Sequence, residues 1–381
     1  MAKRILIFST AYYPLVGGAE VSIKEITDRI QDFEFDLVTA KLRPDLPTRE
    51  RVGNVNVFRF GAGIPLLDKV LLPFRGYFAV RNLQRQNNYH AFYCVMATFA
   101  SGAAYIFNMF SRNKVPIILN LQEGDSEEHF ERRWFGLINL SWKMALKRTA
   151  LLTVLSRYLK DRALNFGYKG GVEVVPNGVD VNRFNIELSS SERLEIRQRF
   201  GLESGDIVLV TTSRLVKKNG VGDVIESLAH LEKKVKFLIL GEGELKKELQ
   251  NLARVVGVSD RVIFAGNVSQ EILPKYLKAS DIFIRSSLSE GFGISFIEAM
   301  AARIPVVATP VGGITDFLKD GETGYFCKPG NPPSIVATIS RVMGDRNKDT
   351  VVENAYNMVL ERYDWEKIVP RIKKIFENIK K

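Results

Sequence analysis

Residues 281–313 have the sequence DIFIRSSLSEGFGISFIEAMAARIPVVATPVGG, and their pattern decides the fold class. A short apolar run ends at Ile284, a polar loop with two glycines follows, and a helical pattern begins after Gly293. A second β-branched run, from Val306 to Ala308, follows that helix. Strand, helix and strand in this order predict a parallel βαβ unit. In an open parallel sheet, ligands bind beyond the carboxyl ends of the strands, where helix N-termini offer N–H groups to phosphate.

The same alternation extends over the whole chain, whose 381 residues suffice for two domains at ~150 residues each. The segment 177–204 separates two series of strands, and its turn signal and serine cluster are typical of a linker. We therefore predict an α/β protein with Rossmann-like domains over 1–180 and 181–364, facing across a cleft. A last helix over 365–381 can pack on either domain, and we assign it to the first. The expected strands are Ile5–Ser9, Phe35–Thr39, Val55–Phe60, Phe92–Met96, Ile117–Leu121, Leu151–Val154, Val172–Val175, Ile207–Thr212, Phe237–Leu240, Val262–Phe264, Ile282–Ile284 and Val306–Ala308. Further expected helices are Ala19–Ile30, Phe130–Lys147 and Arg157–Phe166.

The composition is that of an ordinary globular enzyme with a basic excess, since 54 Lys and Arg face 43 Asp and Glu. A net charge of +11 suggests contact with nucleotide phosphates, nucleic acid or an anionic membrane surface. No recognisable nucleic-acid-binding module accompanies the charge, so we expect no nucleic-acid partner. Two cysteines, Cys94 and Cys327, favour a reducing compartment and predict no disulfide framework. The start of the chain lacks the pattern of a signal peptide.

Candidate binding residues follow from the loop and helix quoted first. Gly291 and Gly293 let the backbone approach a diphosphate, with Phe292, Gly293 and Ile294 supplying amide donors. Glu298 follows Ile294 by four residues and so lies on the same helix face, where its carboxylate can accept hydrogen bonds from both hydroxyls of a ribose. The alternative for Glu298 is an acid favoured by the positive end of the helix dipole.

The carboxylates Glu290 and Glu298 are separated by seven residues in EGFGISFIE, and this spacing resembles the signature of retaining GT-B glycosyltransferases of family GT4, or glycosyltransferase group 1. Other motifs of the family occur in order and cover nearly the whole chain. They are GGAE at 17–20, VVPNGVD at 174–180, SRL at 213–215, LGEGELKKEL at 240–249 and PVVATPVGG at 305–313.

The resemblance implies roles for these positions. Glu298 holds the ribose of a nucleotide-sugar, and Glu290 contacts sugar hydroxyls near the reacting centre. Arg214 and a nearby lysine neutralise the donor diphosphate as it leaves, as expected where negative charge develops in the transition state. Gly17 and Gly18, at the start of the first helix, approach the donor phosphates from across the cleft. A plain tight turn is the alternative for these two glycines.

Two positions depart from the family pattern. The phosphate lysine of many relatives corresponds to Asn219, so we assign its charge to Lys218, with Lys217 as the alternative. The histidine that often ends a first-domain strand corresponds to Gln122, which hydrogen-bonds but does not ionise. If the donor phosphate takes the acceptor's proton, as the resemblance to retaining enzymes implies, no side-chain base is required. The adjacent Glu123 and Asp125 contact acceptor or sugar, or simply cap the helix expected from Phe130.

The basic excess is concentrated between residues 51 and 122. An apolar and aromatic stretch there, IPLLDKVLLPFRGYFAVRNLQR, has cations spaced through it, as in a segment that lies on anionic lipid. An amphipathic surface helix with a solvated basic face fits equally well. The cations are Arg51, Arg59, Lys69, Arg75, Arg81, Arg85, Arg112 and Lys114, against Asp68 alone.

We therefore predict a hexosyltransferase that moves a sugar from a UDP- or GDP-sugar to an acceptor hydroxyl, with retention of anomeric configuration as the resemblance implies. The expected acceptor is lipid-linked or a polysaccharide or glycolipid precursor. No DxD-type acidic pair stands out, so we expect no metal and no cofactor. The alternatives are a GT-B nucleotide-sugar epimerase and a non-catalytic, membrane-associated nucleotide-sugar-binding subunit. We expect a cytoplasmic protein, or one held at the cytoplasmic face of a membrane.

Overall fold

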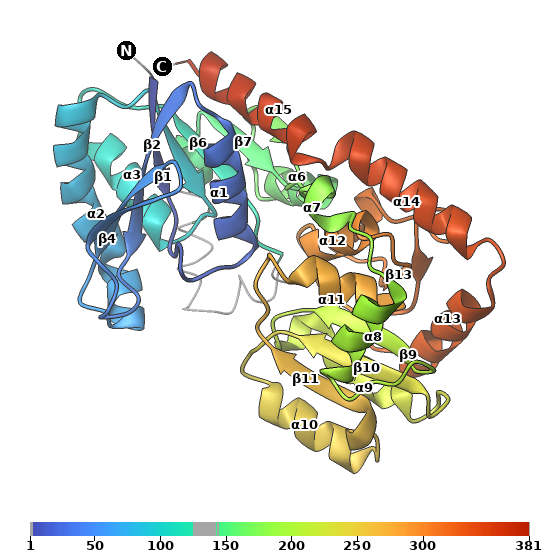
Figure 1. Cartoon of the computed structure of the whole chain (residues 1–381). Helices are drawn as coiled ribbons and strands as arrows, with labels where there is room; N and C mark the ends of the chain where they lie inside the picture. The colour runs from blue at the N-terminus through green and yellow to red at the C-terminus, as the bar shows by residue number, and fades with distance from the viewer. Residues whose placement is uncertain (1–2, 125–141, 143–144, 381) are drawn as a thin grey trace. The chain divides into compact units, whose positions relative to one another are not determined.

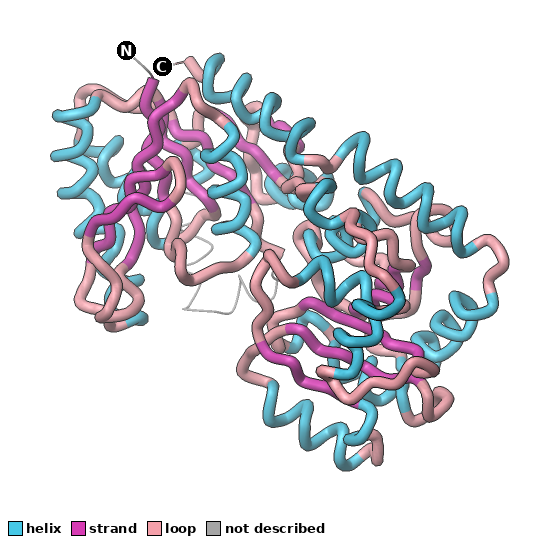
Figure 2. The backbone as a smooth tube through the Cα atoms, in the orientation of Figure 1, coloured by secondary structure: helices cyan, strands magenta, loops and turns pink. Residues whose placement is uncertain are grey.

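The computed structural model describes residues 3–124, 142 and 145–380. The chain divides into two compact units, residues 1–177 with 365–381 and residues 178–364. The expected division lay three residues later, at 180/181, and the last helix belongs to the first unit. Each unit is built on one twisted sheet, drawn in magenta in Figure 2. The two-domain α/β prediction is therefore confirmed.

The first unit has an eight-stranded sheet in the order β3-β4-β2-β1-β5-β6-β7-β8. All neighbouring strands are parallel except β3 and β4. The strands are β1 (Lys3–Phe8), β2 (Phe33–Ala40), β3 (Arg49–Val52), β4 (Val55–Phe60), β5 (Ala91–Val95), β6 (Ile117–Leu121), β7 (Leu151–Val154) and β8 (Val172–Val174). The helices are α1 (Gly18–Arg29), α2 (Pro65–Asn87), α3 (Phe99–Phe110), α6 (Arg157–Asn165) and α15 (Trp365–Asn378).

Alternating strand side chains assign these helices to opposite faces of the first sheet. Ile5 and Ile7 of β1 join a buried cluster with residues of α1 and α15. Phe8, on the other face, packs edge-on against Phe92, which in turn packs against Phe107 of α3. Figure 1 accordingly shows α2 and α3 on one side of this sheet and α1 and α15 on the other.

The second unit has a six-stranded parallel sheet in the order β11-β10-β9-β12-β13-β14. Its strands are β9 (Ile207–Thr212), β10 (Val235–Leu240), β11 (Val262–Gly266), β12 (Ile282–Arg285), β13 (Val306–Ala308) and β14 (Tyr325–Phe326). Its α-helices are α7 (Val181–Phe184), α8 (Ser190–Gln198), α9 (Val221–Leu228), α10 (Lys246–Val255), α11 (Leu273–Ala279), α12 (Ile294–Ala301), α13 (Pro332–Gly344) and α14 (Lys348–Arg362). Helices α9, α10 and α13 contribute to one buried cluster with this sheet.

The linker predicted over 177–204 is wrong, because most of this segment is a folded part of the second unit. The serine cluster begins α8: the Ser189 hydroxyl accepts from the amide of Glu192, and the Glu192 carboxylate accepts from the amide of Ser189. This reciprocal pair is a capping box, which starts a helix rather than a flexible connection.

The expected strands agree with the structure to within two residues at each end. Two short strands, β3 and β14, lie at sheet edges and were not expected. The helix predicted over 130–147 falls mostly outside the described residues. Among the described helices, none is long and apolar enough to cross a bilayer.

Candidate functional site

Two loops at the carboxyl ends of β9 and β12 are joined by hydrogen bonds. The Leu288 amide donates to the Lys218 carbonyl oxygen at 2.7 Å, and the Ser286 hydroxyl donates to the Gly220 carbonyl oxygen at 2.7 Å. Gly220 has φ +65°, and a Cβ added there would lie 1.9 Å from the Ser286 carbonyl oxygen. Only glycine permits this approach. The turn that carries Lys218 is thereby fixed against the loop that carries Glu290.

A third loop, after β13, binds the same segment. The Gly313 amide donates to the carbonyl oxygen of Glu290 at 3.1 Å. The preceding Gly312 has φ +55°, and a Cβ there would lie 1.8 Å from that carbonyl oxygen. The Thr309 hydroxyl donates to the Ser287 carbonyl oxygen at 2.5 Å. The loops after β9 and β13 therefore hold the Glu290 segment, which follows β12, at the sheet edge where the sequence predicts the donor site.

The predicted amide donors lie at the start of α12. Gly293 is its N-cap with φ +95°, and Ile294 is its first residue. Gly291 is buried, and its amide donates to the Glu290 carboxylate at 3.1 Å. The Phe292 side chain is 3% exposed and packs with its ring 5.7 Å from that of Phe317. The structure therefore brings Glu290 and the four predicted backbone positions together at one helix N-terminus.

Arg285, which the sequence analysis did not select, supports this loop from beneath. Its guanidinium forms an ion pair with Glu290 and donates to the hydroxyls of Ser287 at 3.1 Å and Ser295 at 2.8 Å. It also lies 4.4 Å from the centre of the Phe296 ring. Burial lowers the pKa of this guanidinium, whereas the nearby carboxylates raise it. The sequence signal that could have identified Arg285 is its position at the end of the otherwise apolar strand IFIR.

Glu298 lies in the middle of α12 and is 5% exposed. Burial raises the pKa of its carboxyl group to about 7, opposed by Arg183, by a hydrogen bond from Gln270 and by Arg285. Arg183 and Gln270 come from α7 and from the loop after β11, and neither was predicted. Glu298 is therefore buried among polar side chains from distant parts of the second unit, and its burial favours the protonated form relative to an exposed glutamate.

The cations expected at the donor phosphate belong to one turn after β9. Arg214 is exposed, and Lys218 lies in a short 3-10 helix over Lys217–Asn219. Asn219 is 6% exposed, and its side-chain amide donates to the Arg214 carbonyl oxygen at 2.6 Å. The residue at the family's lysine position therefore closes the turn. This geometry agrees with the assignment of the phosphate charge to Arg214 and Lys218, which stays a prediction.

Gly17 and Gly18 belong to the first unit and begin α1. Both are exposed, and the Gly17 amide donates to the Glu20 carboxylate at 2.8 Å. A Cβ at Gly17 would lie 2.9 Å from that carboxylate oxygen, so a side chain there would displace it. Their proposed approach to phosphate stays a prediction.

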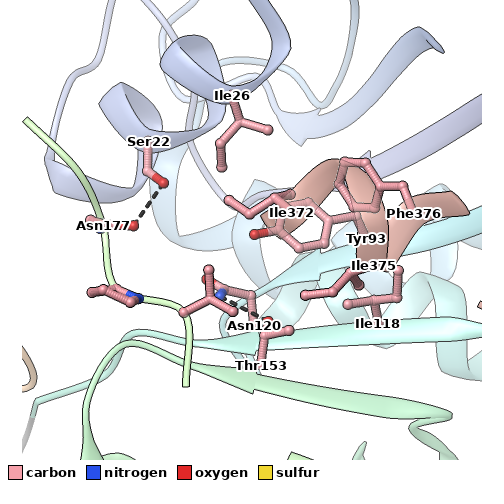
Figure 3. Close-up of a pocket in the computed structure, with 12 residues that line it drawn as sticks. Ser22, Ile26, Tyr93, Ile118, Asn120, Thr153, Asn177, Ile372, Ile375 and Phe376 are labelled. Atoms are coloured by element: carbon pink, nitrogen blue, oxygen red, sulfur yellow. Dashed lines mark hydrogen bonds between the residues drawn. The ribbon is translucent and has the colours of Figure 1, made fainter. Parts of the chain in front are cut away.

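Gln122 is held in a chain of uncharged hydrogen bonds at the carboxyl end of the first sheet. It donates to Asn120 at 2.6 Å and accepts from Asn177 at 3.4 Å. Asn177 in turn accepts from Ser22, and Asn120 donates to Thr153, as the dashed lines in Figure 3 show. A cavity of about 10 Å³ is bordered by Ser22, Asn120, Thr153 and Asn177, and α15 covers it with Ile372, Ile375 and Phe376 (Figure 3). Gln122, for which the motif resemblance implies a histidine in many relatives, is thus held among fixed amides.

Glu123 joins the ends of β5 and β6. Its carboxylate accepts from the amides of Ala97 at 2.6 Å and Gln122 at 3.1 Å. Met96, just before Ala97, has φ +66°, a left-handed conformation that costs non-glycine residues about 1–2 kcal/mol. Burial raises the pKa of the Glu123 carboxyl group to about 7. Glu123 therefore fixes a strained turn, whereas Asp125 lies outside the described residues.

Two family models match the chain: "Glycosyltransferase Family 4" over residues 16–183 and "Glycosyl transferases group 1" over residues 192–358. The chain belongs to this family of glycosyltransferases and has the GT-B fold. The resemblance seen in the sequence motifs is thereby confirmed.

Similar proteins and a similar solved structure agree with this family. An uncharacterized glycosyltransferase of Methanocaldococcus jannaschii is 25% identical, with 98% of each chain covered. The GDP-mannose-dependent alpha-(1-6)-phosphatidylinositol monomannoside mannosyltransferase of Mycolicibacterium smegmatis is 30% identical over 59% of this chain and 64% of that protein. The crystal structure of Anabaena HepE in complex with UDP-glucose superposes with a TM-score of 0.82 at 22% identity, covering 98% of this chain and 99% of that one.

Proposed function

We propose that this glycosyltransferase moves a hexose from a UDP- or GDP-sugar to an acceptor hydroxyl, with retention of anomeric configuration, and that its second unit binds the donor. The observation that carries the proposal is the cluster of three loops around Glu290. It presents a carboxylate on a fixed backbone beside a helix N-terminus and beside the turn that carries Arg214 and Lys218. A sugar diphosphate needs these three kinds of partner.

Each group has a separate task in this proposal. The Glu290 carboxylate accepts hydrogen bonds from sugar hydroxyls, and Arg285 keeps it oriented. Glu298 accepts from the ribose hydroxyls. Amides at the start of α12, together with Arg214 and Lys218, stabilise the diphosphate as negative charge develops on it, so no metal ion is required.

The transfer step needs no ionisable side chain at Gln122. The bond between the sugar C1 and the diphosphate oxygen breaks, and a bond from C1 to the acceptor oxygen forms on the same face. The acceptor's proton passes to the departing diphosphate oxygen. Gln122, fixed by Asn120 and Asn177, positions a hydroxyl rather than taking its proton.

The acceptor in this proposal is lipid-linked, or a glycolipid or polysaccharide precursor, and the enzyme works at the cytoplasmic face of a membrane. Two observations support it: the basic stretch between residues 51 and 122, and the Mycolicibacterium relative, which is named for a phosphatidylinositol monomannoside acceptor.

A transfer assay with UDP- and GDP-hexoses and prenyl-phosphate or glycolipid acceptors tests the proposal, with the product's anomeric configuration read by NMR. Glu290→Ala should abolish transfer. The control Glu203→Ala, an exposed acid shortly before β9 at the opposite edge of the sheet, should not change it. Conversion of donor without acceptor would indicate an epimerase. Donor binding without turnover in the wild type would indicate the non-catalytic binding subunit.

A further inference from the structure

Exposed apolar side chains are concentrated on the outer surface of α2 and α3. Phe74 and Phe78 are each 62% exposed, and Phe110 is 68% exposed. Large aromatic side chains are usually buried, so a group of them in solvent marks an interaction site. Of the fifteen large hydrophobic residues exposed in the described part of the chain, eight lie here: Ile64, Leu66, Leu67, Phe74, Phe78, Phe99, Met109 and Phe110.

Close packing makes the two helices one continuous surface. A Cβ added at Gly76 of α2 would lie 2.7 Å from the Ala103 side chain of α3, and one at Gly102 would lie 3.0 Å from Pro73. Figure 1 shows the two helices side by side on the same side of the sheet. We call the outward side of this pair the α2–α3 face, with the eight exposed residues named above.

The aromatic rings of this face touch across the two helices. The Tyr77 ring lies 5.1 Å from that of Phe78 and 6.1 Å from that of Phe110. The opposite side of α2 is occupied by the protein itself, since Leu72 and Val80 are fully buried. The apolar side chains on the outer side are therefore not required for packing of the described fold.

Positive charge continues the same surface. Arg81 and Arg85 are exposed and follow Phe78 by three and seven residues, so they extend its stripe along α2. The only acid between residues 61 and 114 is Asp68, which is buried and accepts from the amides of Ala62, Gly63 and Ile64. It therefore presents no negative charge to a partner. Cations along this stretch are Lys69, Arg75, Arg81, Arg85, Arg112 and Lys114.

We propose that the α2–α3 face binds an anionic lipid bilayer, with Phe74, Phe78 and Phe110 inserted among the acyl chains and Arg81 and Arg85 at the phosphate groups. Aromatic side chains bordered by arginine, with no exposed acid on α2 or α3 themselves, match the apolar and anionic layers of such a surface. A second protein copy would need acids to face these cations.

The α2–α3 face begins close to the residues where we place the acceptor. Phe99 begins α3 two residues after Ala97, whose amide binds the Glu123 carboxylate beside Gln122. The apolar surface thus starts at the sheet edge where we place the acceptor. The inference rests on the proposed function, because a lipid-linked acceptor at that edge arrives from the bilayer.

Co-sedimentation of the full chain with phosphatidylglycerol–phosphatidylcholine vesicles, at low and high salt, tests the proposal. We expect binding that high salt weakens and that pure phosphatidylcholine does not support. The double variant Phe74→Ser, Phe78→Ser should bind roughly tenfold more weakly, since each phenylalanine loses its apolar burial. Arg81→Gln with Arg85→Gln should weaken binding and reduce its salt dependence.

Val255→Ser is the matched control, because Val255 is 76% exposed but lies in the second unit. It should bind vesicles like the wild type. Equal binding by the wild type and the phenylalanine variant would overturn the proposal, as would a wild type that fails to bind. A wild-type dimer that the phenylalanine variant dissociates, with no vesicle binding by either, would assign the face to a second copy instead.

Nucleotide binding separates this inference from the proposed function. All variants should keep the wild-type thermal stabilisation by UDP or GDP, because no substituted residue lies in the donor site. Transfer to a short, water-soluble acceptor without vesicle binding would overturn the membrane inference but leave the proposed hexosyl transfer and donor site intact. Vesicle binding without any nucleotide stabilisation or transfer would support the face and contradict the function.

Discussion

The raised pKa of Glu298 predicts how the stability of the second unit depends on pH. Burial raises the pKa of its carboxyl group to about 7, from about 4.5 for an exposed glutamate. One pKa unit corresponds to about 1.4 kcal/mol, so full ionisation costs the folded state on the order of 3 kcal/mol. Between pH 4.5 and 7 the folded state binds more protons than the unfolded state. The free energy of unfolding therefore falls as pH rises through this window.

Glu298→Gln removes the titration while it keeps the size and hydrogen-bonding capacity of the side chain. The stability of Glu298→Gln relative to the wild type should rise by about 3 kcal/mol from pH 4.5 to above 7 and then level off. For a unit of this size that is roughly 6–12 °C in the midpoint of its transition. Differential scanning calorimetry from pH 4.5 to 8 measures this difference. Glu203→Gln, at an exposed acid, should show no such trend, and a pH-independent difference for Glu298→Gln would refute the reasoning.

Three further substitutions test contacts within each unit. Gly312→Ala should destabilise the second unit by at least 1 kcal/mol and weaken donor binding in calorimetric titration, because φ at Gly312 is +55° and the new Cβ would lie 1.8 Å from the Glu290 carbonyl oxygen. The control Gly344→Ala, whose new Cβ meets no atom within 4 Å, should change neither stability nor donor binding. Arg285→Met should lower stability by about 3–5 kcal/mol in denaturant titration, since it leaves a carboxylate without its cation; a loss below 1 kcal/mol would contradict the role of this ion pair. Thr153→Val should cost the first unit about 1–3 kcal/mol, because the Asn120 amide loses its acceptor; an unchanged transition would show that the chain of amides relaxes.

Much of the fold follows from local pattern. Parallel strands buried on both faces form continuous β-branched runs, which is why β9, Ile207–Thr212, is predicted with the bounds that the structure has. Edge strands give no such run: β14 has only two residues, Tyr325 and Phe326. The serine cluster at Ser189 was misinterpreted because one composition suits both linkers and helix caps, and only the reciprocal hydrogen bonds distinguish them.

The candidate site likewise contains residues that the sequence predicted and residues that it did not. Gly293 and Glu298 follow from the spacing of a single strand–loop–helix unit, and the structure places Gly293 at the N-cap of α12 and Glu298 within that helix. Arg183 and Gln270 were missed because they approach Glu298 from other elements, 115 and 28 residues away in the chain. Arg285 was missed for another reason: an arginine at the end of a strand usually reaches solvent, whereas this one is covered by the loop that it holds.

The most direct test of donor binding by the second unit is its calorimetric transition in the presence of UDP, GDP or ADP. A ligand that binds only the folded state, at about 100 times its Kd, adds about 2.7 kcal/mol of stability. We predict that one of the three nucleotides raises the transition of the second unit and that Glu298→Ala reduces this rise. If none of the three raises that transition, or if Glu298→Ala leaves the rise unchanged, the assignment of the donor site to Glu298 and the α12 N-terminus is contradicted.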